Sequence, residues 1–555
     1  MSRRVFGSVV QLRADPASQA IVQHGGNVDR RIGRVIILGG GTAGWMTASY
    51  LGKALQSTVD ITVLEAPAIP KIGVGEATVP NLQRVFFDYL GIPEEEWMRE
   101  CNASFKMAVK FVNWRTPGEG EVTPRLVDGR SDHFYHPFGI LGSHDRVPLS
   151  HHWSDRHLRG ETTLPYDYSC FVEPALMDAN KAPKLSDGKA VVNYAWHFDA
   201  HLVADFLRRF ATEKQGVAHV QDEMTEVLRD SRGFITALRT KTGRTLEADL
   251  FVDCSGFRGA LINKVMEEPF LDQGDHLLCD SAVACPVPHD DEKHGVEPYT
   301  TAFAMKSGWA WKTPMLGRFG TGYVYSSEFV ERDQATVDFC RLWGLDPEGT
   351  FNHIRFRVGR NRRSWVKNCV SIGLASCFLE PLESSGLYFT YAAIYQLVKH
   401  FPDRSFDQVL IDRFNREIAD MFDETRDFIQ AHFYFSPRED TPFWRANKEI
   451  VLSADMREKA AMYRAGLPVN PPIVGEGAYY ANFEAEFKNF WTNGSYYCIF
   501  AGLGFLPEHE APVLAYKPDS VPVADRLFAE VRQRQSELLT VLPSSYDYLR
   551  ELHAR

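Results

Sequence analysis

The sequence predicts an α/β fold: a doubly wound sheet of the dinucleotide-binding type, joined to a smaller and mostly helical module. Three observations support this prediction. An apolar run at 34–38 leads into a glycine-rich turn and then into apolar residues at helical spacing. A second apolar run at 61–64 ends at Glu65, which completes a β-turn-α-β pattern. Beyond residue 401 the apolar residues again keep helical spacing.

The bulk composition limits the classes of function. A chain of 555 residues is too long for one compact core, so at least two modules are expected. The net charge of -11 disfavours nucleic acid and anionic membranes as partners, because both need clustered cations. No apolar run is long enough to span a bilayer, which takes about 18 residues.

The N-terminus and the cysteines indicate a cytoplasmic location. The start faintly resembles a twin-arginine signal, but its apolar stretch closes at Arg13 and Asp15, so export is not expected. The nine cysteines are scattered and odd in number, and they form no Cys-x-x-Cys. Reduced cytosolic thiols explain them best.

The chain is expected to divide into three parts. Residues 1–30 read as a flexible tail, since they are polar and lack a period. Residues 31–400 read as the cofactor-binding module with inserted segments that contact the substrate. Residues 401–555 read as the mainly helical module.

The glycine-rich turn is the strongest single motif. Gly39 allows the tight turn, Gly41 lets a pyrophosphate approach the backbone, and Gly44 lets helix pack on strand. Glu65 lies 21 residues after Gly44, where a ribose-binding acid belongs. The later strand-turns at 250–259 and 369–376 favour a flavoprotein, in which distant segments return to the cofactor, over a nicotinamide dehydrogenase.

Several segments in matching order carry a family resemblance. They are Gly-Gly-Gly-Thr-Ala-Gly-Trp (39–45), Val-Gly-Glu-Ala-Thr-Val-Pro (74–80), 96–106, His-Phe-Tyr-His-Pro-Phe (133–138), Gly-Trp-Ala-Trp-Lys-Thr-Pro (308–314), Phe-Leu-Glu-Pro-Leu-Glu-Ser-Ser-Gly (378–386) and 489–497. By these segments, from about residue 33 to the C-terminus, the chain resembles the FAD-dependent tryptophan halogenases. One departure is Thr313, where the family's W-x-W-x-I-P has isoleucine; threonine keeps the β-branched shape.

The resemblance implies that FADH2, O2 and chloride or bromide give hypohalous acid, which must reach an indole without escaping. The implied cofactor-binding residues are Gly39, Gly41, Thr42, Ala43, Gly44, Glu65, Val74 and Ala77. Trp309 and Trp311 correspond to the wall that keeps substrate away from the flavin and so suppresses oxygen insertion. They read equally well as core aromatics, and the two roles are compatible.

Lys106 is the first candidate for the chemistry. Its apolar neighbours disfavour the charged form, so its pKa should fall, and a less protonated amine can accept a halogen or polarise hypohalous acid. The resemblance makes it the family's catalytic lysine. The alternative is a snorkelling surface lysine, a reading that also applies to the nearby Lys110.

The resemblance assigns the proton acceptor and the halide site to one motif. Glu383 would face the lysine, stabilise positive charge on the ring and take its proton. The backbone N–H groups of Ser385 and Gly386 would bind the halide. A lone glutamate is usually a solvated surface group, but this one lies in an apolar, glycine-ended segment.

The implied substrate site fits free tryptophan and not a carrier-tethered pyrrole. His136, Phe138 and Trp491 match the aromatic residues that sandwich an indole. The remaining substrate positions, with Glu486 opposing the ammonium group, are Tyr479, Tyr480, Glu486, Phe490 and Ser495.

Small pocket residues decide which ring carbon is attacked. The pocket residues concerned are Val79, Val109, Ser385 and Gly494-Ser495. This set resembles that of the 6-halogenating members, whereas 7-halogenating relatives tend to carry Ile, Ile, Thr and Ser-Asn at these positions. We therefore expect halogenation at C6, with C7 as the alternative.

Two other functions are weighed against halogenation. A flavin monooxygenase shares the glycine turn but would make Lys106 and Glu383 bystanders. A non-catalytic flavin-binding module would have no use for those residues together with an amino-acid grip.

The sequence also indicates the partners and the setting of the enzyme. No second glycine turn of comparable quality appears, so a separate NAD(P)H-dependent flavin reductase is implied. A metal is not expected, because no partner cluster supports the pairs His133 and His136 or His151 and His152. The family often dimerises and serves natural-product, including antibiotic, biosynthesis. The substrate is tryptophan or an already halogenated tryptophan.

Overall fold

A computed structural model describes residues 29–67, 75–127, 129–470 and 490–554. Its central sheet has six strands in the order β12-β2-β1-β16-β25-β24. Five of them run parallel, and the edge strand β24 pairs antiparallel with β25. The strands are β1 (Arg34–Leu38), β2 (Asp60–Glu65), β12 (Ala218–Gln221), β16 (Leu250–Asp253), β24 (Trp365–Val366) and β25 (Cys369–Ser371).

The apolar residues of β1 alternate between the two faces of this sheet, as expected for a buried strand. Val35 and Ile37 share a core with helix α1 (Thr42–Leu55). Ile36 and Leu38 share a core with Ile235, on the antiparallel meander β13-β14-β15. The other elements concerned are α6 (Ala200–Gln215), α9 (Ser385–Lys399), β13 (Met224–Arg229), β14 (Ile235–Thr240) and β15 (Thr245–Glu247).

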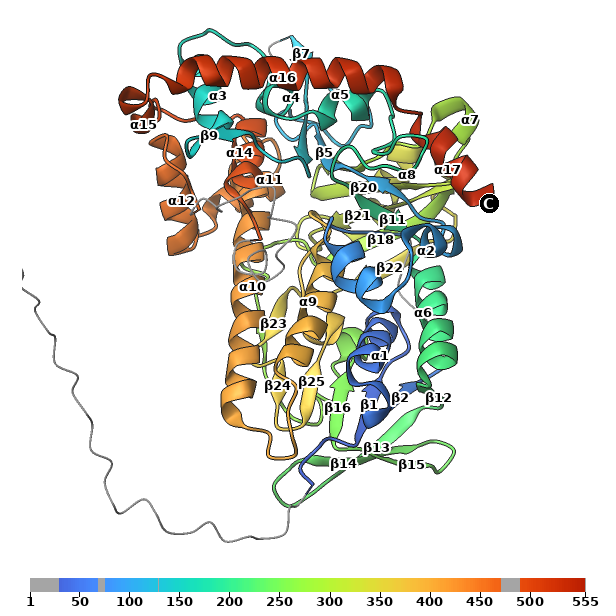
Figure 1. Ribbon diagram of the computed structural model, residues 1–555. Helices are drawn as coiled ribbons and strands as arrows, with labels where there is room; N and C mark the ends of the chain where they lie inside the picture. The colour runs from blue at the N-terminus through green and yellow to red at the C-terminus, as the bar shows by residue number, and fades with distance from the viewer. Residues whose placement is uncertain (1–28, 68–74, 128, 471–489, 555) are drawn as a thin grey trace, which may run out of the picture.

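The mixed α/β class is confirmed, but helices do not cover both faces of the central sheet. Helices α1, α6 and α9 pack together on one face, and the meander lies against the other (Figure 1). The sequence predicted a doubly wound sheet because the β-turn-α-β opening is the same in both layouts. Residues 224–247 cover the second face, because they form the three strands of the meander.

Two further sheets carry most of the candidate site. A seven-stranded mixed sheet has the order β22-β18-β21-β20-β19-β5-β8, and a small sheet has the order β3-β11-β4. Their strands are β3 (Glu76–Ala77), β4 (Ser104–Lys106), β5 (Ala108–Val112), β8 (His133–Pro137), β11 (Ala195–Phe198), β18 (Ser281–Pro288), β19 (Thr300–Met305), β20 (Gly308–Met315), β21 (Arg318–Tyr325) and β22 (Asn352–Arg355).

Short strands and helices fill the connections. A third small sheet has the order β17-β23-β26, and two hairpins pair β6 with β7 and β9 with β10. These elements are β6 (Leu126–Val127), β7 (Arg130–Ser131), β9 (Ser143–His144), β10 (Val147–Pro148), β17 (Phe270–Asp272), β23 (Gly359–Asn361), β26 (Cys377–Phe378), α2 (Glu94–Glu100), α3 (Leu149–Leu158), α4 (Tyr166–Cys170), α5 (Glu173–Asp178), α7 (Asp291–His294), α8 (Arg332–Trp343) and the short helices Gln56–Thr58 (η2), Gln83–Asp88 (η3), Gly256–Arg258 (η4) and Gly373–Ala375 (η5).

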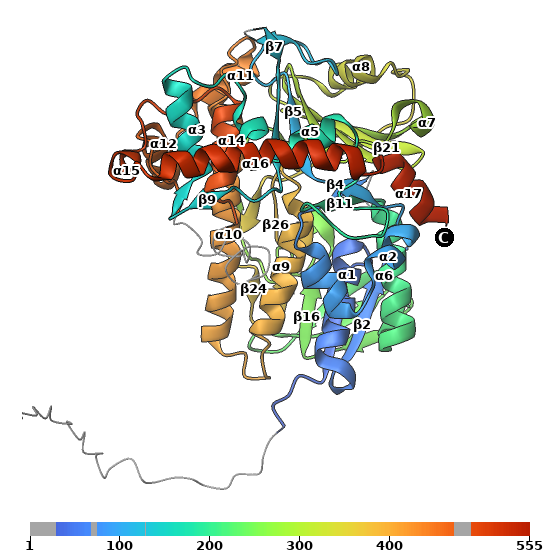
Figure 2. The same cartoon turned by 45° about the horizontal axis from the view of Figure 1, so that its top comes forward.

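The described part of 401–555 is helical. Helix α10 packs on α9, α14 packs on β8, and the long α16 lies across α3, α4 and α5 (Figures 1 and 2). Side chains of α10 and α14 belong to the same core as those of α1 and α9. The helices are α10 (Gln408–Tyr434), α11 (Pro442–Glu449), α12 (Ala454–Arg464), α14 (Asn493–Gly502), α15 (Pro512–Tyr516), α16 (Ser520–Val541) and α17 (Ser545–Ala554). The division into modules stays a prediction.

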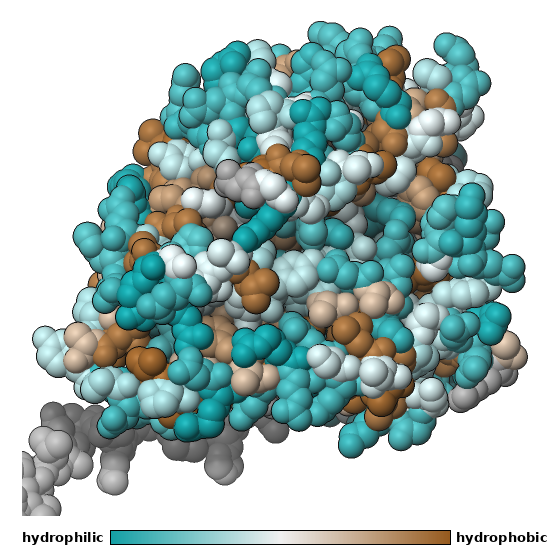
Figure 3. Space-filling view, turned by 90° about the horizontal axis from the view of Figure 1, so that it is seen from above, coloured by the Kyte–Doolittle hydropathy of each residue, from teal (hydrophilic) through white to brown (hydrophobic). Residues whose placement is uncertain are grey.

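The surface and the thiols are ordinary. Among the described helices, none combines the length and the apolarity that a membrane crossing needs. All nine cysteines are buried and unbridged. On the face that carries α16, hydrophilic residues dominate and hydrophobic ones form small separate groups (Figure 3).

Candidate active site

The glycine turn between β1 and α1 has the shape that a dinucleotide requires. Gly39 has a φ of +121°, and a side chain there would strike the carbonyl oxygen of Cys254. A side chain at Gly44 would strike the carbonyl oxygen of Gly39, so helix and strand pack closely at this point. At Gly41 nothing lies within 4 Å of the missing Cβ, so this side of the turn is open. These residues fit the pyrophosphate of FAD at the N-terminus of α1.

The distant segments predicted to return to the cofactor meet the glycine turn. A side chain at Gly373, in η5, would press on Ala43 at the start of α1. The turn η4 that follows β16 contacts η5. Glu65 ends β2 beside Gly40, and its carboxylate accepts a hydrogen bond of 2.8 Å from Nε2 of His219.

The remaining predicted cofactor residues lie on either side of this turn. Thr42 is the first residue of α1, and its hydroxyl donates a 3.4 Å hydrogen bond to the carbonyl oxygen of Ala200. Ala77 ends β3. Val74 lies outside the described residues.

The two tryptophans of the predicted wall share one face of β20. They are two residues apart, and their ring centroids are 6.3 Å apart. Trp311 lies over Gly322 on β21, where a side chain would strike its ring. Trp309 is 1% exposed, and its indole nitrogen donates a 2.9 Å hydrogen bond to Oε2 of Glu380. Thr313, the departure from the family pattern, continues the same face and is also buried.

Lys106 is fully buried at the end of β4. Its Nζ donates hydrogen bonds to the carbonyl oxygen of Thr78, at 3.0 Å, and to the hydroxyl of Ser384, at 2.7 Å. Burial lowers the pKa of the Lys106 amine to about 7, and the nearby carboxylate of Glu383 only partly offsets this. The nearby Lys110 has different surroundings, because its Nζ lies over the ring of Tyr135.

Glu383 is buried between two histidines. Its Oε1 lies 3.0 Å from Nδ1 of His136 on β8 and 3.0 Å from Nε2 of His432 on α10. Burial alone would raise the pKa of the Glu383 carboxyl, but the two histidines outweigh it and lower that pKa to about 2. The structure therefore places an ionised carboxylate close to an amine whose pKa is near neutrality, and Ser384, the residue after Glu383, bonds to that amine.

The predicted halide site is the start of α9. Ser384 adopts a left-handed conformation, with φ of 60°, and turns the chain into the helix. Ser385 and Gly386 are then the first two helical residues, whose N–H groups have no partner within the helix. At Gly386 nothing lies within 4 Å of the missing Cβ. Free N–H groups, open space and the helix dipole together suit a small anion.

An aromatic group adjoins the carboxylate. Trp491 stacks on Phe428 of α10 with centroids 4.0 Å apart, and His136 lies 6.2 Å from Trp491. Phe138 lies 5.1 Å from Nζ of Lys106. Two of the three predicted sandwich residues are thus neighbours, and the third borders the lysine.

Of the other predicted substrate residues, Phe490 adjoins this aromatic group, with its ring centroid 4.6 Å from that of Trp491. Phe490 stacks on Tyr388 of α9 at 3.9 Å. Ser495 lies in the first turn of α14, where its N–H bonds to the hydroxyl of Thr492. Tyr479, Tyr480 and Glu486 lie outside the described residues.

Sequence reasoning missed four residues of this site: Ser384, Glu380, Phe428 and His432. Two of them stood inside or beside motifs already singled out, since Glu380 and Ser384 belong to the segment that contains Glu383. Phe428 is one of the apolar residues at helical spacing beyond residue 401, which reads as a core position. His432 follows it by four residues on the same helix face, and a histidine that continues an apolar stripe was the available signal.

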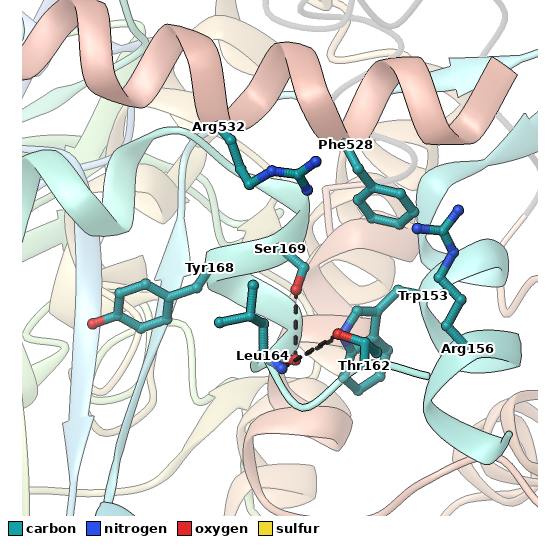
Figure 4. A pocket seen from close by; sticks show the side chains of 8 residues that line it. All are labelled: Trp153, Arg156, Thr162, Leu164, Tyr168, Ser169, Phe528 and Arg532. Carbon is teal, nitrogen blue, oxygen red and sulfur yellow. Dashed lines mark hydrogen bonds between the residues drawn. The ribbon is translucent and has the colours of Figure 1, made fainter. Parts of the chain in front are cut away.

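A pocket on the outside of the molecule is separate from these residues. It lies between α3, α4 and α16, and its volume is about 50 Å³ (Figure 4). Cavities that hold a single benzene ring measure about 150 Å³, so it is too small for an indole. It is lined by Trp153, Arg156, Thr162, Leu164, Tyr168, Ser169, Phe528 and Arg532.

Comparison with known proteins matches this geometry to one family. The family described as tryptophan halogenase matches residues 34–519. The tryptophan 6-halogenase ThaL of Streptomyces albogriseolus is 69% identical, over 95% of this chain and 99% of the relative. The tryptophan 7-halogenase RebH of Lentzea aerocolonigenes is 64% identical over the same shares. Among solved structures, Tar14, a tryptophan C-6 flavin-dependent halogenase (chlorinase) from taromycin biosynthesis, is 39% identical with a TM-score of 0.83, over 94% of this chain and 99% of that chain.

Proposed function

The chain belongs to the flavin-dependent tryptophan halogenases, and on that premise we propose that it halogenates free L-tryptophan at C6, with Lys106 handling the halogen and Glu383 taking the ring proton. As a member of this family it uses FAD, as FADH2, together with O2 and halide. When bound, the reduced cofactor with O2 supplies the oxidising equivalents that turn halide into hypohalous acid. One observation carries the proposal: the buried Lys106 amine lies 2.7 Å from the hydroxyl of the residue that follows Glu383.

Lys106 suits the handling of hypohalous acid in its neutral form. A neutral amine has two N–H bonds and one lone pair. The two acceptors that Nζ contacts, on Thr78 and Ser384, account for both N–H bonds. The lone pair is then left to take up a halogen or to hold hypohalous acid.

Glu383 suits the opposite half of the reaction. Attack by the indole ring puts positive charge on the ring carbons, and a buried carboxylate nearby stabilises that charge. The same carboxylate receives the proton that leaves when the ring regains aromaticity. Its low pKa is no obstacle, because a protonated ring carbon is a far stronger acid than any carboxylic acid.

Ring position cannot be inferred from overall similarity. RebH, a 7-halogenase, is 64% identical to this chain, whereas Tar14, a C-6 enzyme, is only 39% identical. The pocket residues support C6. Val109 pairs across β5 and β8 with His136, and Val79 follows the residue whose carbonyl holds Lys106. Both valines are buried, so an added methylene at either would shift the indole or its neighbours.

The test is product analysis with a purified flavin reductase, NADH, FAD, chloride and L-tryptophan. We expect chlorotryptophan, with NMR placing the chlorine at C6. Chlorination at C7 in the unmodified enzyme contradicts the proposal. One added oxygen would instead identify a monooxygenase, and FAD binding without product would identify a non-catalytic flavoprotein.

A combined variant tests the pocket argument directly. Its five changes are Val79→Ile, Val109→Ile, Ser385→Thr, Gly494→Ser and Ser495→Asn, and we expect them to move product toward C7. The matched control is Val283→Ile, which adds the same methylene to a buried valine in a different part of the core. The control should leave the C6 product unchanged.

The same proposal covers the partners of the enzyme and the rest of its substrate site. A separate NAD(P)H-dependent reductase supplies FADH2, and the enzyme forms a homodimer. Tyr479, Tyr480, Glu486 and Phe490 hold the amino-acid end of the substrate. The cytoplasmic location stays a prediction.

A further inference from the structure

His432 has an acceptor at each of its two ring nitrogens. Nδ1 lies 2.8 Å from the backbone carbonyl oxygen of Phe428, one helical turn earlier in α10. A carbonyl oxygen can only accept, so Nδ1 must carry a hydrogen. Nε2 lies 3.0 Å from Oε1 of Glu383. This second contact therefore needs one more proton, either on the imidazole or on the carboxyl.

The surroundings favour the imidazole as the carrier of that proton. Oε1 of Glu383 also lies 3.0 Å from Nδ1 of His136, and the two histidines together lower the pKa of the Glu383 carboxyl to about 2, so the carboxyl is the ionised member of the pair. A buried carboxylate is costly alone but much less so beside a cation that hydrogen-bonds to it. The rings of Phe111 and Phe428, at 5.2 and 5.0 Å, offer the His432 imidazole an aromatic enclosure that tolerates positive charge.

Other titratable groups facing the pair do not compete for this proton. Lys106 faces it from β4, and burial lowers the pKa of that amine to about 7. Cys498 faces it from α14, and burial raises the pKa of that thiol well above its ordinary value. His136 faces it from β8 and donates through Nδ1.

We propose that His432 is a positioning residue that acts as an imidazolium: it keeps Glu383 ionised and occupies Oε1, so that Oε2 receives the proton of the indole ring. This rests on the role proposed above for Glu383. Both hydrogen bonds that the described residues make to Glu383 go to Oε1, and none goes to Oε2. The oxygen that is free of partners is therefore the one available to the substrate.

The step balances without another reactant. A ring electron pair forms the carbon–halogen bond, the halogen–oxygen bond of hypohalous acid breaks, and hydroxide leaves. The ring C–H bond then breaks, its electron pair returns to the ring, and the proton moves to Oε2 of Glu383. That proton joins the hydroxide to give water, so the imidazolium of His432 is the same at the end as at the start.

Glu76 and Glu380 show what Glu383 would become without this partner. Glu380 is buried and Glu76 is partly buried, and desolvation raises the pKa of each carboxyl to about 7. Removing the charge of His432 should move the pKa of Glu383 toward that range. A protonated Glu383 could no longer accept the ring proton.

The test uses two variants and a matched control. In His432→Gln a neutral amide can still donate to Oε1, whereas His432→Phe fits the aromatic surroundings but donates nothing. The control is His400→Gln, since Nδ1 of His400 contacts the carbonyl oxygen of Gln396 in the same helical geometry without a carboxylate partner. The readout is the single-turnover rate of halotryptophan formation against pH, with FADH2 supplied ready-made.

For the wild type and the control, we expect the logarithm of the rate to fall by one unit per pH unit on the acid side. The reason is that Lys106 alone must lose a proton. His432→Gln should show a slope approaching two and lose about tenfold more rate than the wild type between about pH 8 and pH 6, because a second group must also be ionised. His432→Phe should show the same change. A wild-type pH profile in His432→Gln overturns the proposal.

The protonation state of the histidine can be measured directly in the wild-type enzyme, which depends neither on the folding of a variant nor on turnover. With nitrogen-15 histidine in the full-length enzyme, the NMR spectrum should contain one imidazolium with both nitrogens protonated at about pH 8. It should vanish in His432→Gln and persist in His400→Gln. If no such imidazolium exists in the wild type, the proposal is wrong. If the imidazolium is present and no halotryptophan forms, it is the proposed function that fails.

Discussion

The indole nitrogen of Trp309 donates a 2.9 Å hydrogen bond to Oε2 of Glu380, and both side chains are buried. The tryptophan belongs to the predicted wall, and the glutamate is the first acid of the segment that also supplies Glu383. Burial raises the pKa of Glu380 to about 7, whereas the pKa of Glu383 is lowered to about 2. The pKa values of two acids three residues apart are thus shifted in opposite directions. Glu380 holds Trp309 by a hydrogen bond, and Glu383 carries a charge.

Replacing Glu380 separates its support of the wall from its charge. Glu380→Gln keeps an acceptor for Trp309, so the yield of halotryptophan per reduced FAD should be unchanged. Glu380→Leu leaves the indole N–H buried without a partner, which should cost about 1–3 kcal/mol of unfolding free energy and lower that yield. Denaturant unfolding and product yield per NADH check both expectations. An unaltered yield in Glu380→Leu would show that the wall needs no support.

Lys106→Met should stabilise the protein most at low pH. The pKa of Lys106 falls from 10.5 to about 7 on folding, so between these values the unfolded chain binds more protons than the folded one. The folded state therefore loses stability as pH falls through this window, and the full penalty is present below about pH 7. Melting temperatures of variant and wild type should differ more at about pH 6 than at about pH 9, while halogenation is abolished and FAD binding kept. The exposed Lys53, changed to Met, should show no such pH dependence.

Two alanine substitutions in the glycine turn should have different effects. Gly41→Ala points into open space, so the melting temperature of the apoprotein should be nearly unchanged while the Kd for FAD rises about tenfold or more. Gly44→Ala strikes the backbone of Gly39 and should lower that melting temperature as well. Flavin fluorescence titration and thermal unfolding measure the two effects. Equal FAD affinity in Gly41→Ala and the wild type would place the cofactor elsewhere.

Ser384→Ala should slow halogenation without weakening FAD binding. The change removes one of the two acceptors that orient the Lys106 amine, and we expect the rate to drop roughly tenfold. Ser436→Ala is a suitable control, since its buried hydroxyl donates to the carbonyl oxygen of Trp114 and accepts from the backbone N–H of Arg438, both in another part of the structure. The control should leave the rate per folded enzyme unchanged, whatever its effect on stability. A fast Ser384→Ala enzyme would remove this hydroxyl from the mechanism.

Much of the site could be predicted because its residues sit in short motifs. The local pattern of the glycine turn predicts its geometry, whereas Lys106 and Glu383 were predicted because each lies in a contiguous segment that resembles the family. The strand-turn at 369–376 could also be placed, since a small-residue turn after a buried strand meets its neighbours at one sheet edge.

The remainder depends on contacts between segments that are distant in the chain. His432 lies 49 residues after Glu383, and nothing local shows that α10 aims this histidine at that carboxylate. The meander on the second face of the central sheet is a similar case, because short polar strands at 224–247 resemble surface loops until they have a sheet to cover. Long-range packing decides both.

The strand β11 connects the two halves of the reaction mechanically. One edge of it pairs with β3, which leads from the flavin side to Thr78, and the other edge pairs with β4, which ends at Lys106. The carbonyl of Thr78 closes this loop by accepting from the lysine itself. The two outer strands are only about 10 Å apart across the ladder. Because Ala77 on β3 is a predicted flavin-binding residue, we expect a displacement of β3 to reach the Lys106 amine through Thr78 and β11.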